Sequence, residues 1–245
     1  MAIKPILFNT EMVRAILDGR KTCTRRLVNP RQFMGMLPDR CKNATPDEFL
    51  KNKRMMFKPY CDMTDAELIM TAYKEPYQPG DILYVRETVW QKIGYYLDVD
   101  GETKPSWYNE FRYVASDEKP ETGWNYSWVK RPSIHMPKEA ARIWLKVTGV
   151  RVERLQEIDE DGVWDEGFRF KPPCLTRVSA DGHTCDLDGP CTSSIKYCDM
   201  TMGELFGREL WNNTIKKPDL DRYGWDANPW VWVIEFERCE KPEGR

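Results

Sequence analysis

The sequence predicts an α+β fold in which mixed strands and a few helices form a small closed or half-closed β-barrel with helices at its ends. Apolar or alternating stretches predict four strands, at Pro5–Phe8, Gly80–Trp90, Ala141–Leu155 and Asn228–Arg238. Capping residues followed by apolar stripes predict helices between some of them. Strands and helices do not alternate regularly, so a doubly wound parallel fold is disfavoured.

The composition is that of a folded domain with ample material for a core. Of 245 residues, 41% are hydrophobic and 10 are Trp. No run approaches the ~20 apolar residues of a membrane helix, and the N-terminus lacks a secretory pattern. We therefore expect a cytoplasmic protein without a membrane partner, whose 8 Cys are reduced thiols or metal ligands. The net charge of −2 argues against a general nucleic-acid-coating protein, so any such function must rest on a local patch.

The first helix is predicted by both of its ends. Asn9 or Thr10 can cap it, and an apolar stripe follows at helical spacing. Gly19 is a natural left-handed terminator. The chain after it, from Lys21 to Val28, is expected to be extended.

Two segments interrupt the pattern and are predicted to be insertions, at about 30–76 and 169–200. The first contains one clear helix, which starts at a capping box formed by Thr64 and Glu67. Together with a tail at 241–245, these boundaries predict a single domain over 1–240.

The remaining elements complete the predicted domain. The Asp100-Gly101 pair predicts a hairpin after the second strand. A short acidic helix is expected before Gly167, and a helix with a second capping box at Thr201 and Glu204 precedes the closing strand.

The residues after the first helix raise the main functional question. Lys21, Thr24, Arg25 and Arg26 follow Gly19 with little apolar sequence between them. A solvated basic turn is one interpretation. A site that holds an anionic or polar substrate is the other.

Five segments in this order resemble the ASCH domain of the PUA-like β-barrel superfamily, especially its longer phage and prophage members. They are "GRKTCTRR", "PGDILYVRETVW", "VTGVRVERLQEI", "DEGF" and "NPWVWVIEFER". The resemblance implies a PUA-like mixed barrel and a role with RNA or nucleosides, in a bacterial host cell if the chain is phage-encoded. Small members that resemble this core are amidohydrolases that remove the acetyl group from N4-acetylcytidine, and others have been associated with RNA binding or cleavage.

The resemblance also implies catalytic residues. Lys21 and Thr24 match a Lys and a Thr of the basic motif in type and spacing, and Glu166 best matches a Glu on the short helix. Arg26 matches the closing arginine of the motif. The chain is more than twice as long as the minimal domain, so its substrate is not necessarily a free nucleoside.

Amide hydrolysis is chemically compatible with these side chains. Thr24 would be the nucleophile or hold a water, Lys21 would be the base, and Glu166 would carry a proton to the leaving nitrogen. Lys21 must lose its proton for this, which burial and the neighbouring charges of Arg25 and Arg26 would favour. Strict strand alternation puts Lys21 and Thr24 on opposite faces, so they converge only if the chain is still turning before Cys23.

Other residues are candidates for substrate contacts. Glu87 competes with Glu166 as the carboxylate and, if buried, needs a partner such as Arg86 or Lys21. Tryptophans outside the core can stack on bases, whereas Trp230 and Trp232 of the closing strand are expected to pack in the core. The predicted substrate-binding residues are Arg20, Arg25, Arg26, Glu87, Trp107, Trp124 and Trp128.

The second insertion holds five soft ligands whose spacing lacks a C-x-x-C pair. Four of the five would suffice for a structural zinc, which is the metal that the sequence suggests, and an insertion without metal is the alternative. The expected chemistry requires no cofactor. The candidate ligands are Cys174, His183, Cys185, Cys191 and Cys198.

Three functions remain open at this point. The first is a hydrolase of a modified nucleoside or nucleic acid, most concretely of N4-acetylcytidine. The second is an RNA-binding module or ribonuclease, whose partner is RNA or DNA and whose basic motif contacts phosphates. The third is a non-catalytic phage accessory protein whose barrel is an interaction scaffold.

Overall fold

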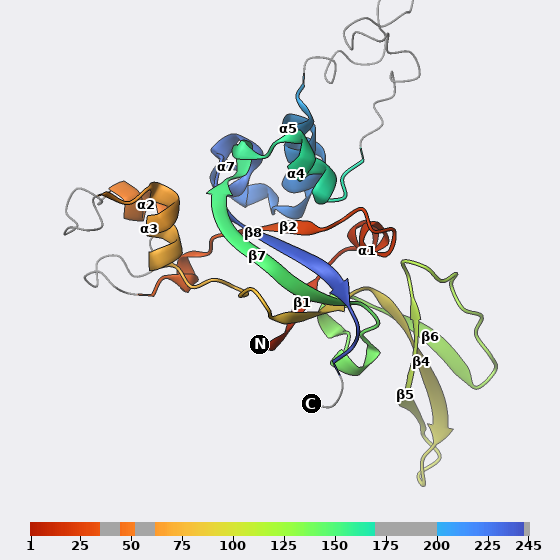
Figure 1. Cartoon of the computed structure of the whole chain (residues 1–245). Helices are drawn as coiled ribbons and strands as arrows, with labels where there is room; N and C mark the ends of the chain where they lie inside the picture. The colour runs from red at the N-terminus through yellow and green to blue at the C-terminus, as the bar shows by residue number, and fades with distance from the viewer. Residues whose placement is uncertain (35–44, 52–61, 170–199, 243–245) are drawn as a thin grey trace, which may run out of the picture. The chain divides into compact units, whose positions relative to one another are not determined.

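The computed structural model describes residues 1–34, 45–51, 62–169 and 200–242 (Figure 1). These residues belong to two compact units, each assembled from separate segments of the chain. The first comprises Met1–Thr22, Tyr77–Gly149 and Glu235–Arg245, and the second comprises Cys23–Pro76 and Val150–Ile234. Candidate zinc ligands at 174, 183, 185, 191 and 198 lie outside the described residues.

The larger sheet has five strands in the order β1-β3-β7-β8-β2. Strand β1 pairs in parallel with β3, and β3 pairs antiparallel with β7, so the sheet is mixed. This confirms an α+β fold with mixed strands. The described strands do not close into a barrel, and the PUA-like barrel stays a prediction. The strand bounds are β1 Ile3–Leu7, β2 Cys23–Leu27, β3 Ile82–Arg86, β7 Trp144–Arg154 and β8 Trp230–Cys239.

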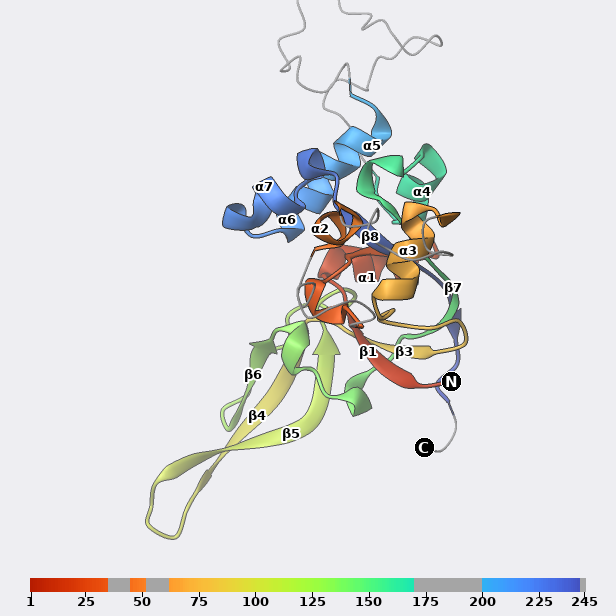
Figure 2. The ribbon, with the colours of Figure 1, turned by 90° about the vertical axis from the view of Figure 1, so that its left-hand side faces the viewer.

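The smaller sheet is antiparallel and belongs to the first unit. Its strands are β4 (Val89–Leu97), β5 (Thr103–Tyr113) and β6 (Tyr126–Arg131), with β4 in the centre (Figure 2). The predicted hairpin is confirmed, because β4 and β5 are joined by a turn in which Gly101 has a φ of +76°.

The predicted single strand Gly80–Trp90 is wrong. The chain forms two strands, since β3 ends at Arg86 and β4 begins at Val89 in the other sheet. Between them, the Glu87 side chain is buried and ion-paired with Arg142, which fixes the point where the chain leaves the larger sheet. The third predicted strand, Ala141–Leu155, corresponds to β7, which includes Gly149 without a break.

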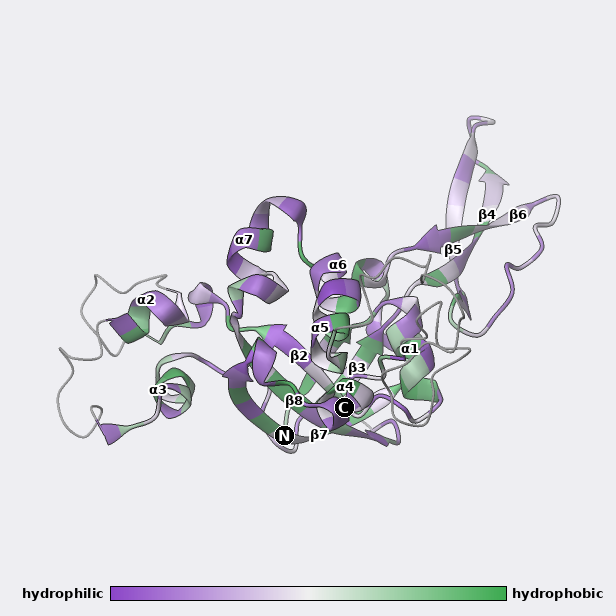
Figure 3. Cartoon of the chain, turned by 90° about the horizontal axis from the view of Figure 1, so that it is seen from above, coloured by the Kyte–Doolittle hydropathy of each residue, from purple (hydrophilic) through white to green (hydrophobic). Residues whose placement is uncertain are grey.

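The predicted helix caps are confirmed. Asn9 accepts a hydrogen bond from the Met12 N–H and caps α1 (Thr10–Leu17), whose apolar and polar sides are visible in Figure 3. Thr64 and Thr201 form capping boxes with Glu67 and Glu204. The remaining α-helices are α2 Pro46–Lys51, α3 Asp65–Ala72, α4 Glu160–Asp165, α5 Met202–Leu205, α6 Asn212–Thr214 and α7 Leu220–Tyr223.

Short helical turns connect several of these elements. A π-helical segment, Phe206–Trp211, continues α5 into α6. Among the described residues, no helix is long and apolar enough to cross a membrane. The 3₁₀ turns are Pro30–Gln32, Ser133–His135, Lys138–Ala140, Leu155–Glu157, Lys217–Asp219 and Trp225–Ala227.

Each unit has its own apolar core. In the first, Ile82, Val89 and Trp144 pack with Met136 and the alanines around residue 140. In the second, a larger cluster includes Leu155, Val163, Phe206, Trp225 and Val231. Burial of these side chains is the main favourable term in folding each unit.

The segment predicted as the first insertion contains a packed aromatic group. The rings of Phe33, Phe49 and Tyr73 contact one another edge to face, with centroids 5.4–5.8 Å apart. The backbone of Gln32 and Met34 bonds to that of Lys74 and Ala72, which ties the two ends of the segment together.

Asp81 anchors the N-terminal strand of the first unit. Its carboxylate accepts bonds from the Ala2 N–H at 2.8 Å, the Lys4 ammonium at 2.7 Å and the Gln78 N–H at 3.1 Å. Burial acts to raise the pKa of Asp81, but the bonds from Lys4, Ala2 and Gln78 outweigh it and hold that pKa below its ordinary value.

We predict that Asp81→Asn lowers the free energy of unfolding by about 1–3 kcal/mol at pH 7. A carboxylate with a lowered folded-state pKa stabilises the fold fully above its unfolded pKa of about 3.9 and loses this contribution as the pH falls through its folded pKa. The difference between wild type and variant should therefore shrink at acid pH in urea unfolding. An equal difference at pH 7 and pH 3 would contradict this account.

Candidate functional site

The basic motif begins where α1 ends, and the chain there is still turning. The N–H groups of Arg20 and Lys21 both donate to the carbonyl of Ala15, at 2.8 and 3.0 Å, and Gly19 has a φ of +73°. This is a left-handed helix terminus of the kind that glycine favours. Strand β2 starts only at Cys23, so Lys21 lies outside the strict alternation of the strand.

Lys21 is buried in the first unit. The residue is 3% exposed, and its ammonium lies 5.6 Å from the centroid of the Phe8 ring. Burying an ammonium is costly, so it needs polar or aromatic surroundings. Arg20 differs, because it pairs with Asp18 near the surface at 2.8 Å. A solvated basic turn therefore does not describe Lys21.

Strand β2 places the next residues of the motif in the second unit. It pairs with β8, as the bond from the Val28 N–H to the Trp230 carbonyl shows. Thr24 is 1% exposed, and Arg25 is also buried. Successive residues of a strand face opposite sides, so Thr24 and Arg25 project in opposite directions.

Glu166 comes from 141 residues further along the chain and meets this motif at the edge of the sheet. Its Oε1 accepts a hydrogen bond from the backbone N–H of Arg25 at 2.6 Å. Strand β2 is the last strand in the order, so the carboxylate occupies a position where a further strand would accept this bond. Glu166 thus contacts the basic motif at Arg25.

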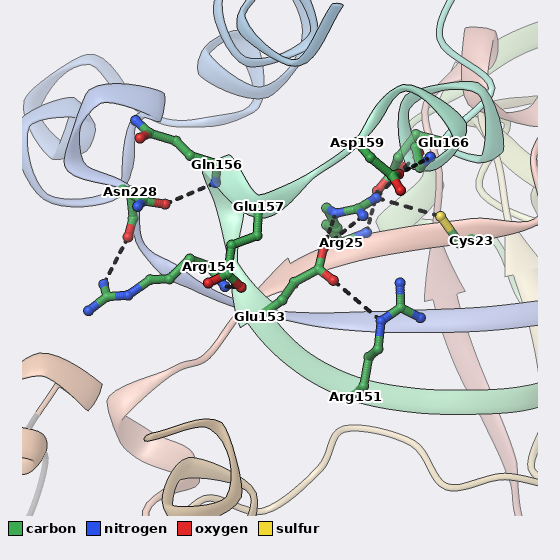
Figure 4. A network of polar contacts seen from close by, with 11 residues as sticks. Cys23, Arg25, Arg151, Glu153, Arg154, Gln156, Glu157, Asp159, Glu166 and Asn228 are labelled. Atoms are coloured by element: carbon green, nitrogen blue, oxygen red, sulfur yellow. Dashed lines mark hydrogen bonds and ion pairs between the residues drawn. The ribbon is translucent and has the colours of Figure 1, made fainter. Parts of the chain in front are cut away.

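The side chain of Arg25 contacts two carboxylates, those of Glu153 and Glu166 (Figure 4). It contacts Glu153 of β7, with Nη2 2.7 Å and Nε 2.9 Å from Oε1, and its Nη1 lies 3.6 Å from the Glu166 carboxylate. Burial acts to lower the pKa of Arg25, but Glu166 and Glu153 outweigh it and raise that pKa above its ordinary value. The charge of Arg25 is thus matched by two carboxylates within the protein.

The position of Glu166 is set by the residues that begin and end helix α4. Asp159 caps the helix by accepting from the Gly162 N–H at 2.8 Å, and Val163 is fully buried in the core of the second unit. At the other end Gly167, with a φ of +75°, donates to the Trp164 carbonyl and stops the helix directly after Glu166. The carboxylate is therefore held by a short, capped and anchored helix.

Gly162 gives Arg25 the room it needs. A Cβ at this position would lie 2.9 Å from Arg25 Nη2, and the Gly162 carbonyl accepts from Nη1 at 3.4 Å. The sequence reasoning missed Gly162 and Glu153. Glu153 alternates with Val152 and Arg154 in β7 as an ordinary polar position does, so no local pattern distinguishes it.

Glu87, the competing carboxylate, has a different partner in the first unit. It forms a two-pronged ion pair with Arg142, at 2.9 and 3.1 Å, and Arg142 in turn lies 3.9 Å from the centroid of the Tyr113 ring. We expected Arg86 or Lys21 as the partner of a buried Glu87, and the structure shows Arg142 instead. Arg86 instead donates to the carbonyls of Met136 and Ile134.

The candidate tryptophans of the smaller sheet do not share one surface. Trp107 pairs with Ile93, and Trp128 pairs with Lys92, so they lie on opposite faces of the sheet. Trp124, in the loop before β6, is 95% exposed. Trp230 and Trp232 are buried, as expected for the closing strand.

The described residues offer no cluster of three or more His, Cys, Asp or Glu side chains that could hold a metal ion. The Arg25–Glu166 contact itself consists of a carboxylate, a backbone N–H and a guanidinium.

Comparison of the chain with family models, with curated proteins and with solved structures finds no match.

We predict that Arg25→Lys lowers the free energy of unfolding by about 1.5–3 kcal/mol, because an ammonium cannot reproduce the fork of bonds to Glu153 and Gly162. Arg20→Lys is the matched control within the same motif. Its ion pair with Asp18 lies near the surface, so we expect a change within about 0.5 kcal/mol. Chemical denaturation measures both, and equal effects of the two substitutions would refute a buried structural role for Arg25.

Proposed function

We propose that this chain is a hydrolase of a modified nucleoside or nucleic acid, most concretely an N4-acetylcytidine amidohydrolase. We further propose that its larger sheet is the core of a PUA-like ASCH barrel. The single observation that supports the activity most is the 2.6 Å contact of Glu166 with the backbone of Arg25. It brings a carboxylate from a distant segment to the basic motif, which is what the resemblance implies.

The proposed reaction breaks the amide bond between the acetyl carbon and N4 of the base. Water adds across it, which gives acetate and cytidine. In this proposal Thr24 attacks the carbonyl or holds the attacking water, and Glu166 carries a proton to the leaving N4. Lys21, which is buried just after α1, accepts the proton of the nucleophile.

Arg25 has a positioning role in this proposal. Its side chain bonds to Glu153 and its backbone N–H bonds to Glu166, so it fixes the carboxylate rather than contacting substrate. Arg26 is half-buried and remains the proposed donor to the carbonyl oxygen or to a phosphate of the substrate.

The alternative function is RNA binding without amide hydrolysis, in which the cationic side chains of the basic motif contact phosphates. Among those cations, Arg25 is the least suited, since its guanidinium is buried and already paired with carboxylates. This observation favours the hydrolase over a phosphate-binding motif centred on Arg25.

We predict that Glu166→Gln lowers turnover of N4-acetylcytidine by about 10²–10⁴-fold. Glutamine keeps an oxygen that accepts the Arg25 N–H but cannot transfer a proton in the same way. Release of cytidine measures the effect, and Glu160→Gln, an exposed acid on the same helix, is the control. Full activity of folded Glu166→Gln would overturn the assigned role.

We predict that Thr24→Val abolishes cytidine release while Thr24→Ser retains part of it. Valine copies the shape of threonine without the hydroxyl, so it separates packing from chemistry at a fully buried position. If wild type releases no cytidine yet binds RNA in a salt-sensitive manner, the binding function replaces the hydrolase.

A further inference from the structure

One face of the β4–β5–β6 sheet carries aromatic and cationic side chains next to one another. The strand register places Trp90 opposite Arg112 and Lys130, and Lys92 opposite Trp128. Directly opposed residues of antiparallel strands project to the same side. We call this surface the aromatic face and define it by Trp90, Lys92, Tyr108, Arg112, Tyr126, Trp128 and Lys130.

The cations of the aromatic face lie over its rings. Lys92 Nζ is 5.4 Å from the Tyr108 centroid and 4.8 Å from the Tyr126 centroid. The Arg112 guanidinium is 5.7 Å from the Trp128 ring, and Lys130 Nζ is 5.8 Å from the Trp90 ring. Each cation is attracted by the negative face of a ring, so rings and charges form an alternating layer.

Two glycines let tyrosine rings lie close against the backbone. A Cβ on Gly94 would lie 2.5 Å from the Tyr108 ring, and one on Gly123 would lie 2.3 Å from the Tyr126 ring. Any other residue would push these rings away. The rings are thus held against the sheet, and Tyr108 is nevertheless 45% exposed.

The opposite side of the sheet fixes this platform in place. Val89, Gln91 and Ile93 of β4 are buried, and Val89 belongs to the core of the first unit. The Gln91 amide donates to the Tyr108 carbonyl at 3.0 Å and accepts from Arg131 at 2.5 Å, at the point where the β4–β5 register shifts. An ordered platform loses little conformational entropy on binding.

We propose that the aromatic face binds single-stranded nucleic acid by stacking unpaired bases on its rings while Lys92, Arg112 and Lys130 contact phosphates. The occupant must offer flat aromatic surfaces and negative charge together, which unpaired nucleotides do at every position. Glu110 offsets one of the three cations through its 3.0 Å contact with Lys92, so the face stays positive although the whole chain has a net charge of −2.

The rings of the aromatic face can stack on the bases of a short stretch of nucleotides. Three adjacent strands contribute rings, and a sheet of this kind commonly stacks roughly two or three bases. A duplex would keep its bases paired and present only phosphates to the face.

This inference goes beyond the proposed hydrolase and does not rest on it. All residues of the aromatic face belong to the first unit. Of these residues, only Trp128 is also a substrate-binding candidate from the sequence, and none is assigned a step of amide hydrolysis. Fluorescence anisotropy with a labelled uridine-rich RNA, the same sequence as DNA, and the corresponding duplex tests it without N4-acetylcytidine. We expect both single strands to bind more tightly than the duplex. Stronger binding of the RNA strand would identify RNA as the ligand, and stronger binding of the DNA strand would identify DNA.

Matched substitutions locate the binding. Tyr108→Ala should weaken single-strand binding by roughly 5- to 150-fold, which corresponds to the loss of one stacked base. Tyr95→Ala is the control, since Tyr95 has a similar exposed fraction of 49% on the opposite face of the same sheet. Trp128→Ala serves as a second variant if Tyr108→Ala unfolds, and Lys130→Gln should lower the slope of log affinity against log salt by about 0.7.

Three results would overturn the proposal. The first is that the wild-type protein binds neither single strand. The second is that it binds the duplex as tightly as the single strands. The third is that folded Tyr108→Ala and Trp128→Ala bind single strands no more weakly than Tyr95→Ala does.

Discussion

The hydrogen bond between the Glu166 carboxylate and the Arg25 backbone N–H is the interaction on which the candidate site depends. It joins residues 141 positions apart at 2.6 Å, on the outer edge of strand β2. A buried carboxylate there requires compensation, and the Arg25 guanidinium supplies it while also satisfying Glu153. Gly162, Asp159 and Gly167 then serve one purpose, which is to shape a short helix that ends at this contact.

Within this arrangement, the residues of one short motif have different surroundings. Arg25 forms a buried ion pair with Glu153, and Arg20 forms an ion pair with Asp18 near the surface. Thr24 and Lys21 are buried, and the Lys21 ammonium lies 5.6 Å from the centroid of the Phe8 ring. This division explains why a dense run of cations in the sequence does not behave as one uniform basic patch.

Local chemistry made much of the fold predictable. Asn9, Gly19, Thr64, Gly101, Gly167 and Thr201 act within a few residues of themselves, so helix starts, helix ends and the hairpin followed from the sequence. The break between β3 and β4 depends on the ion pair of Glu87 with Arg142, 55 residues away, and no local pattern encodes it. Glu153 and Gly162 were missed for the same reason, since their importance appears only when β2 and α4 are adjacent to β7.

Hydrogen exchange at the Arg25 backbone amide tests the central claim most directly. An outward-facing amide on an edge strand ordinarily exchanges with the solvent, whereas one bonded to a buried carboxylate is protected. We expect a strongly protected Arg25 amide in the wild-type protein and loss of that protection in Glu166→Ala while the amides of β8 stay protected. Rapid exchange at Arg25 in the wild-type protein, or unchanged protection in Glu166→Ala, would contradict it.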